Sequence, residues 1–392
     1  MKLHGSTLLL AFGLLVPAPS RADEPSAVAL PEPASTATLD APPEGTPAAV
    51  SNPASQRPLT EIPLEKGLPV VVRVALAYLD ISAVDENEET FDGTVDVRLL
   101  WQDPRLRFPS SEAPIGYAEL RGRDALERLE GMWSPDVAIA NLRGEPDYRA
   151  VGLRILPDGT VELLQRTTGT FSISMDVERF PFDRQALAVD LVSRRENADK
   201  LVFDYRQADI DFTRVDPSIA IPGWDLGLVD LVRTPIAGWH GESYSRLRFE
   251  LDIDRKAAET VPSLFVPLLA SLLIPLLATW LNKMEDGEFR IETFELTNIV
   301  IGGLFAVIAL NFTINAERSL LSHGTNTVSR LFGLNYLTLA LSFGVNVALF
   351  RFGAVRRFFG RHVQEEVFHY VSWALPVLVA SSAIAIVLLA RV

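Results

Sequence analysis

Four runs of uncharged, mostly apolar residues constrain this chain more than any other feature. They cover residues 261–281, 296–316, 331–350 and 371–390. Each run is long enough to cross the roughly 30 Å hydrocarbon core of a bilayer as a helix. One such run is also compatible with a buried core helix, but four in succession predict a membrane domain over residues 258–392.

The first 22 residues are typical of a secretory signal peptide. Lys2 supplies the positive start, residues 8–16 form an apolar core too short to span a bilayer, and Ala22 ends a small-residue cleavage site. A short N-terminal anchor is the alternative. Residues 23–63 are dominated by Pro, Ala, Ser and Thr. They bury too little apolar surface to offset the entropy of ordering, so we expect a disordered periplasmic leader.

Between residues 64 and 257 the side-chain pattern has period two. Apolar residues alternate with polar ones along 91–101 and again along 247–253, and residues 157–160 (PDGT) form a hairpin signal between two apolar runs. Residues 112–130 break this rhythm and are expected to contain a helical turn. Many short strands without a long helical period predict an all-β, immunoglobulin-like antiparallel sandwich. The all-α membrane domain of four helices follows it.

The exported sandwich and the loop charges predict the same topology. The first span runs inward, and four spans return the C-terminus to the outer side. The connection between the third and fourth spans then lies in the cytoplasm, and it carries Arg351, Arg356, Arg357 and Arg361, as the positive-inside rule requires. The first cytoplasmic loop is acidic instead, but acidic residues count little in that rule.

Charge and composition exclude several functions. With 36 basic and 50 acidic residues the formal net charge is −14, which argues against nucleic-acid binding. The chain has no cysteine, so disulfides, thiolate metal sites and a cysteine nucleophile are excluded. Its five histidines are scattered, and it has no nucleophile motif and no Gly-rich phosphate loop. We therefore expect no catalytic site, no metal site, no cofactor and no enzymatic activity.

Three motifs in the sandwich segment are specific in combination. They are residues 101–106 (WQDPRL), residues 133–136 (WSPD) followed by Asn141, and residues 175–183 (MDVERFPFD). With a signal peptide, a sandwich and four spans, they resemble the pentameric ligand-gated ion channels, the Cys-loop receptor superfamily. Arg255, Pro262 and Pro267 have the spacing with which prokaryotic members enter their first span. The resemblance covers residues 64–392 and implies a homopentameric ion channel of a bacterial inner membrane.

The chain departs from this family in its cysteines and aromatic residues. The two cysteines of the signature loop would fall at Ile173 and Leu187, which are both apolar. Ala140, Asp96 and Arg194 stand where the aromatic cage for amine transmitters would lie. The link between the first two spans (282–294) is also longer than in bacterial members.

The resemblance places the pore along the second span. Counting back from residues 309–311 (ALN), which resemble the end of that helix in bacterial relatives, gives one stripe at helical spacing. The stripe consists of Glu295, Asn298, Gly302, Phe305, Ala309 and Phe312, continuing to Ala316. Five copies would form an acidic ring at the cytoplasmic mouth, a polar ring, and two apolar constrictions that gate by dewetting. An acidic ring favours cations, although Glu288 or Glu292 can supply the same charge.

Two alternatives to this stripe stay open at the level of sequence. Phe305 and Phe312 can instead pack against neighbouring helices. A register shifted by one residue lines the pore with a second stripe, made of Ile299, Gly303, Ala306, Leu310 and Thr313.

Residues that couple the sandwich to the membrane helices are expected where the two meet. The resemblance implies a turn between the first two strands, the apolar wedge of the signature loop, and charges beside the first and second spans. These are Asp85, Glu86, Phe180, Pro181, Phe182, Asp183, Arg255 and Arg318. Opposite charges there can form an ion-pair relay that differs between two states, or they can be solvated turn charges.

The ligand site is implied between adjacent sandwiches, behind a flap at residues 235–244. The candidate contacts are Arg98, Arg194, Arg195, Trp239, His240 and Tyr244. A basic, partly aromatic pocket suits a carboxylate, whereas surface arginines are often only solvated. Protons are an alternative trigger, because Asp and Glu titrate near pH 4 and clustering raises some pKa values toward about 5 to 6.

These observations predict a ligand- or proton-gated, cation-selective ion channel. Its expected partners are four further copies of the chain, the lipid bilayer, permeant cations, and an unknown small ligand or protons. The alternative is a membrane-anchored periplasmic binding protein that signals without conducting.

Overall fold

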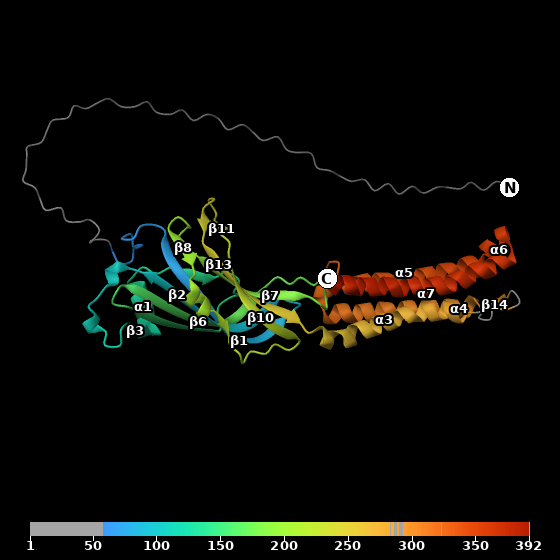
Figure 1. Ribbon diagram of the computed structural model, residues 1–392, viewed down its shortest axis with the longest axis horizontal. Helices are drawn as coiled ribbons and strands as arrows, with labels where there is room; N and C mark the ends of the chain where they lie inside the picture. Colours follow the sequence, from blue (N-terminus) through green and yellow to red (C-terminus); the bar gives the residue numbers. More distant parts are fainter. Residues whose placement is uncertain (1–57, 283, 286–287, 290–292, 323, 392) are drawn as a thin grey trace, which may run out of the picture. The chain divides into compact units, whose positions relative to one another are not determined.

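The computed structural model describes residues 58–392 apart from residues 283, 286–287, 290–292, 323 and 392. The predicted signal peptide (1–22) lies outside the described residues, as does the predicted leader up to residue 57. A β-rich part precedes a helical part, as Figure 1 shows. The predicted fold class, a β domain followed by four apolar helices, is confirmed.

Strands form most of the first part. In chain order they are β1 (Val70–Asp85), β2 (Thr90–Gln102), β3 (Ala118–Arg121), β4 (Val137–Ile139), β5 (Tyr148–Ile155), β6 (Thr160–Ser172), β7 (Arg184–Ser193), β8 (Leu201–Asp204), β9 (Arg214–Val215), β10 (Trp224–Arg233), β11 (Ile236–Ala237), β12 (Ser243–Tyr244) and β13 (Arg246–Arg255). Short helices α1 (Arg123–Glu130) and α2 (Gln207–Phe212) interrupt them, with 3-10 turns at Pro104–Leu106 and Ser110–Glu112. The helical turn expected within residues 112–130 is therefore present as α1.

Two sheets enclose one core. The larger sheet has the order β3-β5-β6-β2-β1-β8, with β9 also pairing with β1, and the smaller has the order β10-β13-β7-β4. The apolar residues of the alternating segment in β2, among them Phe91 and Leu99, are buried, as is every second residue of β13 from Leu247 to Ile253. The predicted period-two pattern is confirmed. The PDGT segment forms the β5–β6 turn, in which Gly159 has a φ of 80° that favours glycine.

Tyr78 ties the two sheets together. Its hydroxyl on β1 donates to the carbonyl of Leu187 on β7 at 2.8 Å. Burial raises the pKa of Tyr78 far above its usual value, and the nearby charges of Glu250 and Asp190 raise it further. The hydroxyl therefore stays a donor at any physiological pH.

The WQDPRL motif fastens the segment that enters the sandwich. Asp103 is fully buried and pairs with Arg105. The Nη2 atom of Arg105 lies 2.7 Å from Oδ2 of Asp103. Arg105 also donates to the carbonyls of Leu59 and Glu61 at 3.3 and 2.8 Å, and Leu59 and Ile62 pack on the core. The folded domain thus begins before the boundary expected at residue 64, because this guanidinium holds the preceding residues.

The WSPD…N motif joins the two sheets. Trp133 is 1% exposed. The amide of Asn141 donates to the carbonyls of Ser172 and Ala188 at 2.8 and 2.7 Å, and its oxygen accepts from the Asp190 amide at 2.9 Å. These motif residues therefore stabilise the sandwich itself.

The helical part contains the four predicted spans and one short helix. The helices are α3 (Ala257–Leu281), α4 (Thr293–Glu317), α5 (Thr327–Asn346), α6 (Ala354–Phe359) and α7 (Arg361–Arg391). A two-stranded hairpin, β14 (Met284–Glu285) and β15 (Glu288–Phe289), follows α3, a 3-10 turn (Ser319–Ser322) follows α4, and a π-helical turn (Val347–Arg351) follows α5. Within the part of the chain that the structure describes, four helices are long and apolar enough to cross a membrane.

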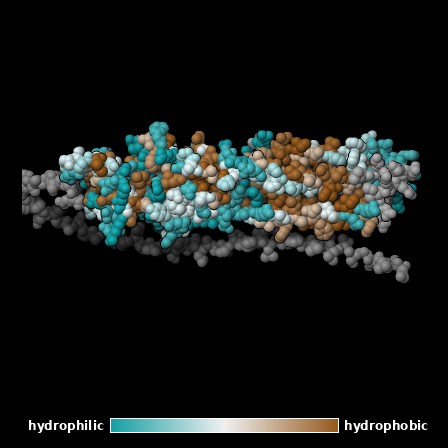
Figure 2. All heavy atoms as spheres, turned by 90° about the horizontal axis from the view of Figure 1, so that it is seen from below, coloured by the Kyte–Doolittle hydropathy of each residue, from teal (hydrophilic) through white to brown (hydrophobic). Residues whose placement is uncertain are grey.

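The helices begin three to ten residues before the apolar runs, α7 earliest of all. The helical hydrogen bonds continue through polar residues beyond the hydrocarbon core. The apolar runs in the sequence mark only the part of each helix inside that core. Figure 2 shows the resulting apolar band over the helices, bounded by the hydrophilic surface of the sandwich. These helices give the chain the architecture of a multi-pass membrane protein.

Candidate functional site

Helix α4 has one packed face and one bare face. Leu296 is buried, and Val300 and Val307 are buried in the apolar core of the helices. Gly303 is also buried against the side chains of Leu339 on α5 and Ile274 on α3. A Cβ atom at this position would lie 3.2 Å and 3.3 Å from them. The packed face therefore points toward α3 and α5.

The predicted pore stripe lies on the opposite face of α4. All of its members from Glu295 to Ala316 are exposed in the single chain, and Phe305 and Phe312 are 68% and 75% exposed. At 100° per residue the centre of this stripe is about 150–180° from the centre of the packed face. The alternative stripe contains the buried Gly303 and the half-buried Leu310, so part of it is occupied by contacts within the chain.

The predicted coupling residues meet at the membrane-facing end of the sandwich. Arg255 is 3% exposed and bonds Asp183 through Nε at 2.7 Å and Nη2 at 3.0 Å. Its Nη1 lies 2.6 Å from Oε1 of Glu86, and the other oxygen of Glu86 lies 3.1 Å from Nη1 of Arg318. A chain of four charges thus runs from the signature loop to the end of α4. We call it the junction network.

Burial and pairing act in opposite directions on Arg255. Burial lowers its pKa, but the hydrogen bonds to Asp183 and Glu86 outweigh burial, so the pKa is raised above its usual value. The guanidinium therefore stays charged.

Aromatic rings surround the same guanidinium. Its Cζ lies 4.2 Å from the ring centroid of Trp224 and 4.8 Å from that of Phe180. Phe180 is fully buried and stacks on Phe265 of α3 at 6.4 Å. The apolar wedge of the signature loop, which continues through Pro181 and Phe182, thus packs against the ends of the helices that face the sandwich.

Asp85 and its neighbour Asn87 hold the turn between β1 and β2. Oδ1 of Asp85 accepts from the backbone amides of Asn87 and Glu88 at 2.9 and 3.0 Å. The side chain of Asn87 then donates to the carbonyl of Glu317 at 3.3 Å and lies 3.1 Å from the hydroxyl of Ser319. Asp85 shapes the turn, while Asn87 makes its contact with α4.

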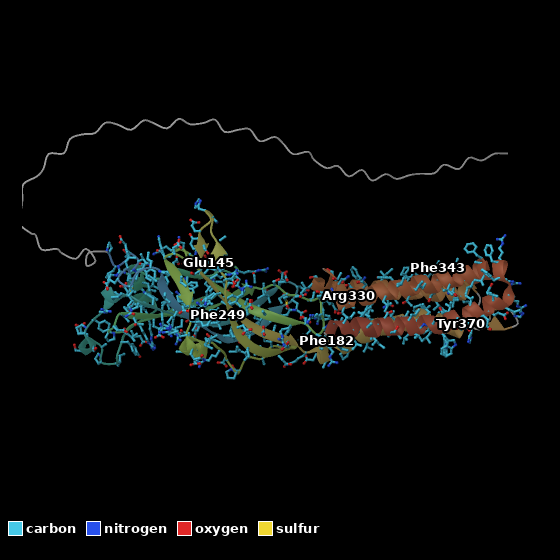
Figure 3. The ribbon with its side chains drawn as sticks, turned by 45° about the horizontal axis from the view of Figure 1, so that its top comes forward. Glu145, Phe182, Phe249, Arg330, Phe343 and Tyr370 are labelled. Atoms are coloured by element: carbon cyan, nitrogen blue, oxygen red, sulfur yellow. The ribbon has the colours of Figure 1, made fainter. Side chains whose placement is uncertain are left out.

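The signature loop also reaches the other two spans. Glu178 pairs with Arg330 of α5 at 3.1 Å, and the Cζ of Arg391, at the end of α7, lies 6.0 Å from the ring of Phe182. Figure 3 shows Phe182 and Arg330 at the boundary between sandwich and helices. Sequence reasoning missed Trp224, Arg330 and Arg391, because their partners are distant in the chain.

Hydrogen bonds close the signature loop of this chain, in place of the disulfide that the family's two cysteines would form. The side chain of Gln185, 4% exposed, donates to the carbonyl of Asp176 at 2.6 Å and to Oδ2 of Asp183 at 2.7 Å. Its oxygen accepts from the Asp176 amide at 2.9 Å. The apolar positions Ile173 and Leu187 pack in the sandwich core instead.

A groove of about 380 Å³ lies beside the predicted flap. Its lining includes Arg194, Trp239, His240, Glu242 and Tyr244. Trp239 is fully exposed at the flap tip, and the groove lies between β11–β12 and the end of β7. Four of the six predicted ligand residues are thus brought together.

Arg98 and Arg195 do not line this groove. Arg195 is exposed beside it. Arg98 lies on the larger sheet, where its Nη2 is 3.0 Å from Oδ1 of the fully buried Asp209, and its guanidinium stacks on the ring of Phe212 at 4.2 Å. Asp209 also binds Arg73 at 2.8 Å. Within one chain Arg98 therefore belongs to a separate charged cluster, because a carboxylate from α2 neutralises it.

Comparison with known proteins agrees with this architecture. Residues 56–257, about half of the chain, match the family model described as the neurotransmitter-gated ion-channel ligand binding domain. The chain is 24% identical over 250 residues to a proton-gated ion channel of Gloeobacter violaceus, covering 64% of either chain.

Two animal receptor subunits are also similar. The chain is 25% identical over 256 residues to the glycine receptor subunit beta of Rattus norvegicus (62% of this chain, 47% of the relative). It is 24% identical over 226 residues to a gamma-aminobutyric acid receptor subunit beta of Caenorhabditis elegans (54% and 38%). The chain thus spans 38% to 64% of the length of these relatives. They are a channel and receptor subunits rather than enzymes, in agreement with the expectation from sequence. The chain belongs to the Cys-loop family of pentameric ligand-gated ion channels.

Proposed function

We propose that five copies of this chain form a stimulus-gated, cation-selective channel in a bacterial inner membrane, with the sandwich in the periplasm. The observation that carries the proposal is the bare face of α4, opposite the face that packs on α3 and α5. One helix cannot enclose water, whereas five such faces around an axis line a pore.

The residues of the bare face give each level of this pore a function. Glu295 lies at the end of α4 far from the sandwich and supplies a ring of negative charge that attracts cations. Phe305 and Phe312, which lie closer to the sandwich end of α4, form two apolar collars. A narrow apolar collar offers water no hydrogen-bond partners, so it excludes water and ions until the helices move apart.

The junction network transmits the stimulus to this pore. Glu86 holds Arg255 of the sandwich with one oxygen and Arg318 after α4 with the other. A shift of the β1–β2 turn therefore moves the end of α4. The stimulus changes the open fraction only by its differential affinity for the closed and open states.

The flap groove is the proposed receptor site for a small ligand. Arg194 and Glu242 supply opposite charges, and Trp239 and Tyr244 supply aromatic surface. This combination suits a small zwitterion or carboxylate. Protons are the second candidate stimulus, supported by the printed description of the Gloeobacter relative. Carboxylates Glu89, Asp176 and Glu178 line a hollow of about 560 Å³ at the junction, next to the coupling loops.

Planar bilayers containing the purified chain test the proposal. We expect particles of about 216 kDa from five chains of 43.2 kDa, and currents that respond to pH steps or to a panel of small carboxylates, amines and zwitterions. Replacement Glu295→Gln should lower cation over anion permeability. A monomeric or dimeric particle, or silence under every stimulus, favours the non-conducting binding protein.

A matched pair of variants tests the pore face. Phe305→Ser gives water partners at the apolar collar and is expected to produce resting leak or activation at a weaker stimulus. Ala306→Ser, one residue on, is expected to change neither. The opposite result, with leak from Ala306→Ser alone, assigns the pore to the second stripe.

A further inference from the structure

The short helix α6 separates its charged and apolar side chains completely. At 100° per residue, Arg356 and Arg357 lie on one side, while Ala354, Val355 and both phenylalanines, Phe358 and Phe359, lie on the other. The two phenyl rings are 79% and 70% exposed in the chain. Such exposed rings are unfavourable in water, so this side of α6 requires an apolar environment.

The position of α6 supplies that environment. It connects the end of α5 to the start of α7, at the end of the helix bundle away from the sandwich (Figure 1). The first turns of α7 lead into exposed aromatic side chains, Tyr370 and Trp373, and Trp373 stacks edge-on against Trp280 at the end of α3 at 6.4 Å. A belt of Trp and Tyr marks the boundary between hydrocarbon and headgroups, so α6 lies on the cytoplasmic side of that boundary.

The arginines of α6 have no ion-pair partner among the described residues. Among the described residues, no carboxylate lies within ion-pair distance of Arg356 or Arg357, whereas Arg361 at the start of α7 pairs with Glu365 at 3.1 Å. Both α6 arginines are exposed. Guanidinium groups bind phosphate oxygens through paired hydrogen bonds.

We propose that α6 and the start of α7 form a binding site for anionic phospholipids of the cytoplasmic leaflet. Arg356 and Arg357 bind the phosphate groups of the lipid, with Arg361 adding long-range attraction. Phe358 and Phe359 insert at the level where acyl chains begin. The long arginine side chains span the distance between these two levels. This site does not depend on whether the chain conducts ions.

Lipid titration of the purified full-length chain in a neutral detergent tests the site. The probes are dioleoyl phosphatidylglycerol and dioleoyl phosphatidylcholine, and bound lipid is counted by native mass spectrometry. Each surface arginine contributes a factor of about five to the binding of an anionic lipid surface. The double variant R356Q/R357Q is therefore expected to bind phosphatidylglycerol roughly 30-fold more weakly and phosphatidylcholine unchanged.

The control double variant R123Q/R128Q removes the same charge from the exposed surface of α1, in the sandwich. We expect it to bind phosphatidylglycerol like the unaltered chain. The proposal is wrong if the α6 variant keeps its affinity for phosphatidylglycerol. Displacement of the lipid by millimolar inorganic phosphate would identify free phosphate as the ligand and would also overturn it.

A second measurement does not depend on removing arginines. Because the chain has no cysteine, a nitroxide label at Phe359→Cys reports a single position. In nanodiscs of phosphatidylglycerol, the label should be more accessible to oxygen than to a water-soluble nickel chelate. The same label at Leu126→Cys, exposed on α1, should show the opposite ratio. Equal ratios at both positions contradict the insertion of α6.

Discussion

At the membrane-facing end of the sandwich, the Arg255 side chain is 3% exposed between two carboxylates and two aromatic rings. At the flap end, Trp239 is fully exposed beside an open groove. The chain thus completes its own contacts where the sandwich meets the helices and leaves them unfilled at the flap. The first end is held in one geometry by its own contacts, and the second end presents aromatic and charged side chains around an open groove.

The largest difference between the two ends is expected for Arg255→Ala. The change leaves the carboxylate of Asp183, 1% exposed, buried without its partner, a loss of about 3–5 kcal/mol for a buried pair. A thermal melt in detergent measures it. The control Arg184→Ala removes an exposed arginine that pairs with Asp254 at 2.7 Å, and its melting temperature should match that of the unaltered chain.

The same variant makes a prediction about pH. Because the pKa of Arg255 is raised in the folded state, its contribution to stability is present at all pH values below the usual arginine pKa and is lost only as the pH rises through the raised value. The destabilisation by Arg255→Ala is therefore expected to be equal at pH 7 and pH 9.5. A clear decrease at pH 9.5 would mean that this arginine is not the group that stabilises the junction.

The replacement Gln185→Leu is expected to have the next largest effect. It removes the side-chain bonds that close the signature loop, so the buried carboxylate of Asp183 and the partly buried backbone groups of Asp176 lose their bonds to this side chain. Such a loss destabilises by about 1–3 kcal/mol. The control Gln207→Leu removes an exposed amide that bonds Asp211 at 3.0 Å. If both variants melt at the temperature of the unaltered chain, the closure of the loop does not rest on Gln185.

Arg318→Gln should separate stability from coupling. The pair with Glu86 is partly exposed, 33% and 21%, so its loss changes stability by less than about 1 kcal/mol. In the proposed channel, the stimulus needed for half-maximal current should shift several-fold, because the link from Glu86 to α4 is broken. An unchanged stimulus response together with an unchanged melt would leave Asn87 as the main contact of this turn with α4.

Trp239→Ala at the flap is expected to have no measurable effect on stability, since the side chain is fully exposed. A ligand that stacks in the groove should lose at least tenfold in potency, while activation by protons at the junction should be unaffected. Leu228→Ala, at a residue 80% exposed on β10, is the matched control. A fall in melting temperature would show that Trp239 packs in the assembly and would weaken the comparison of the two ends.

The sequence predicted well what depends on periodicity and local order. The buried faces of β2 and β13, the β5–β6 turn and the four spans follow from spacing alone. It also identified both partners of the Arg255–Asp183 pair through the family resemblance. It could not assign Arg98, because its carboxylate, Asp209, lies 111 residues further along the chain and only the folded sheet brings them together. The contacts of Arg330 and Arg391 with the signature loop were missed for the same reason.

The signature loop has one further consequence for how the protein matures. Gln185 and Asp176 close it by hydrogen bonds that form and break reversibly, where a disulfide would require an oxidant and the correct pairing of thiols. Biogenesis of this chain therefore contains no redox step, and its fold is indifferent to the glutathione poise of the compartment in which it is made. Strong reductant in a cell-free lysate supplied with a membrane is therefore expected to leave its folding unchanged.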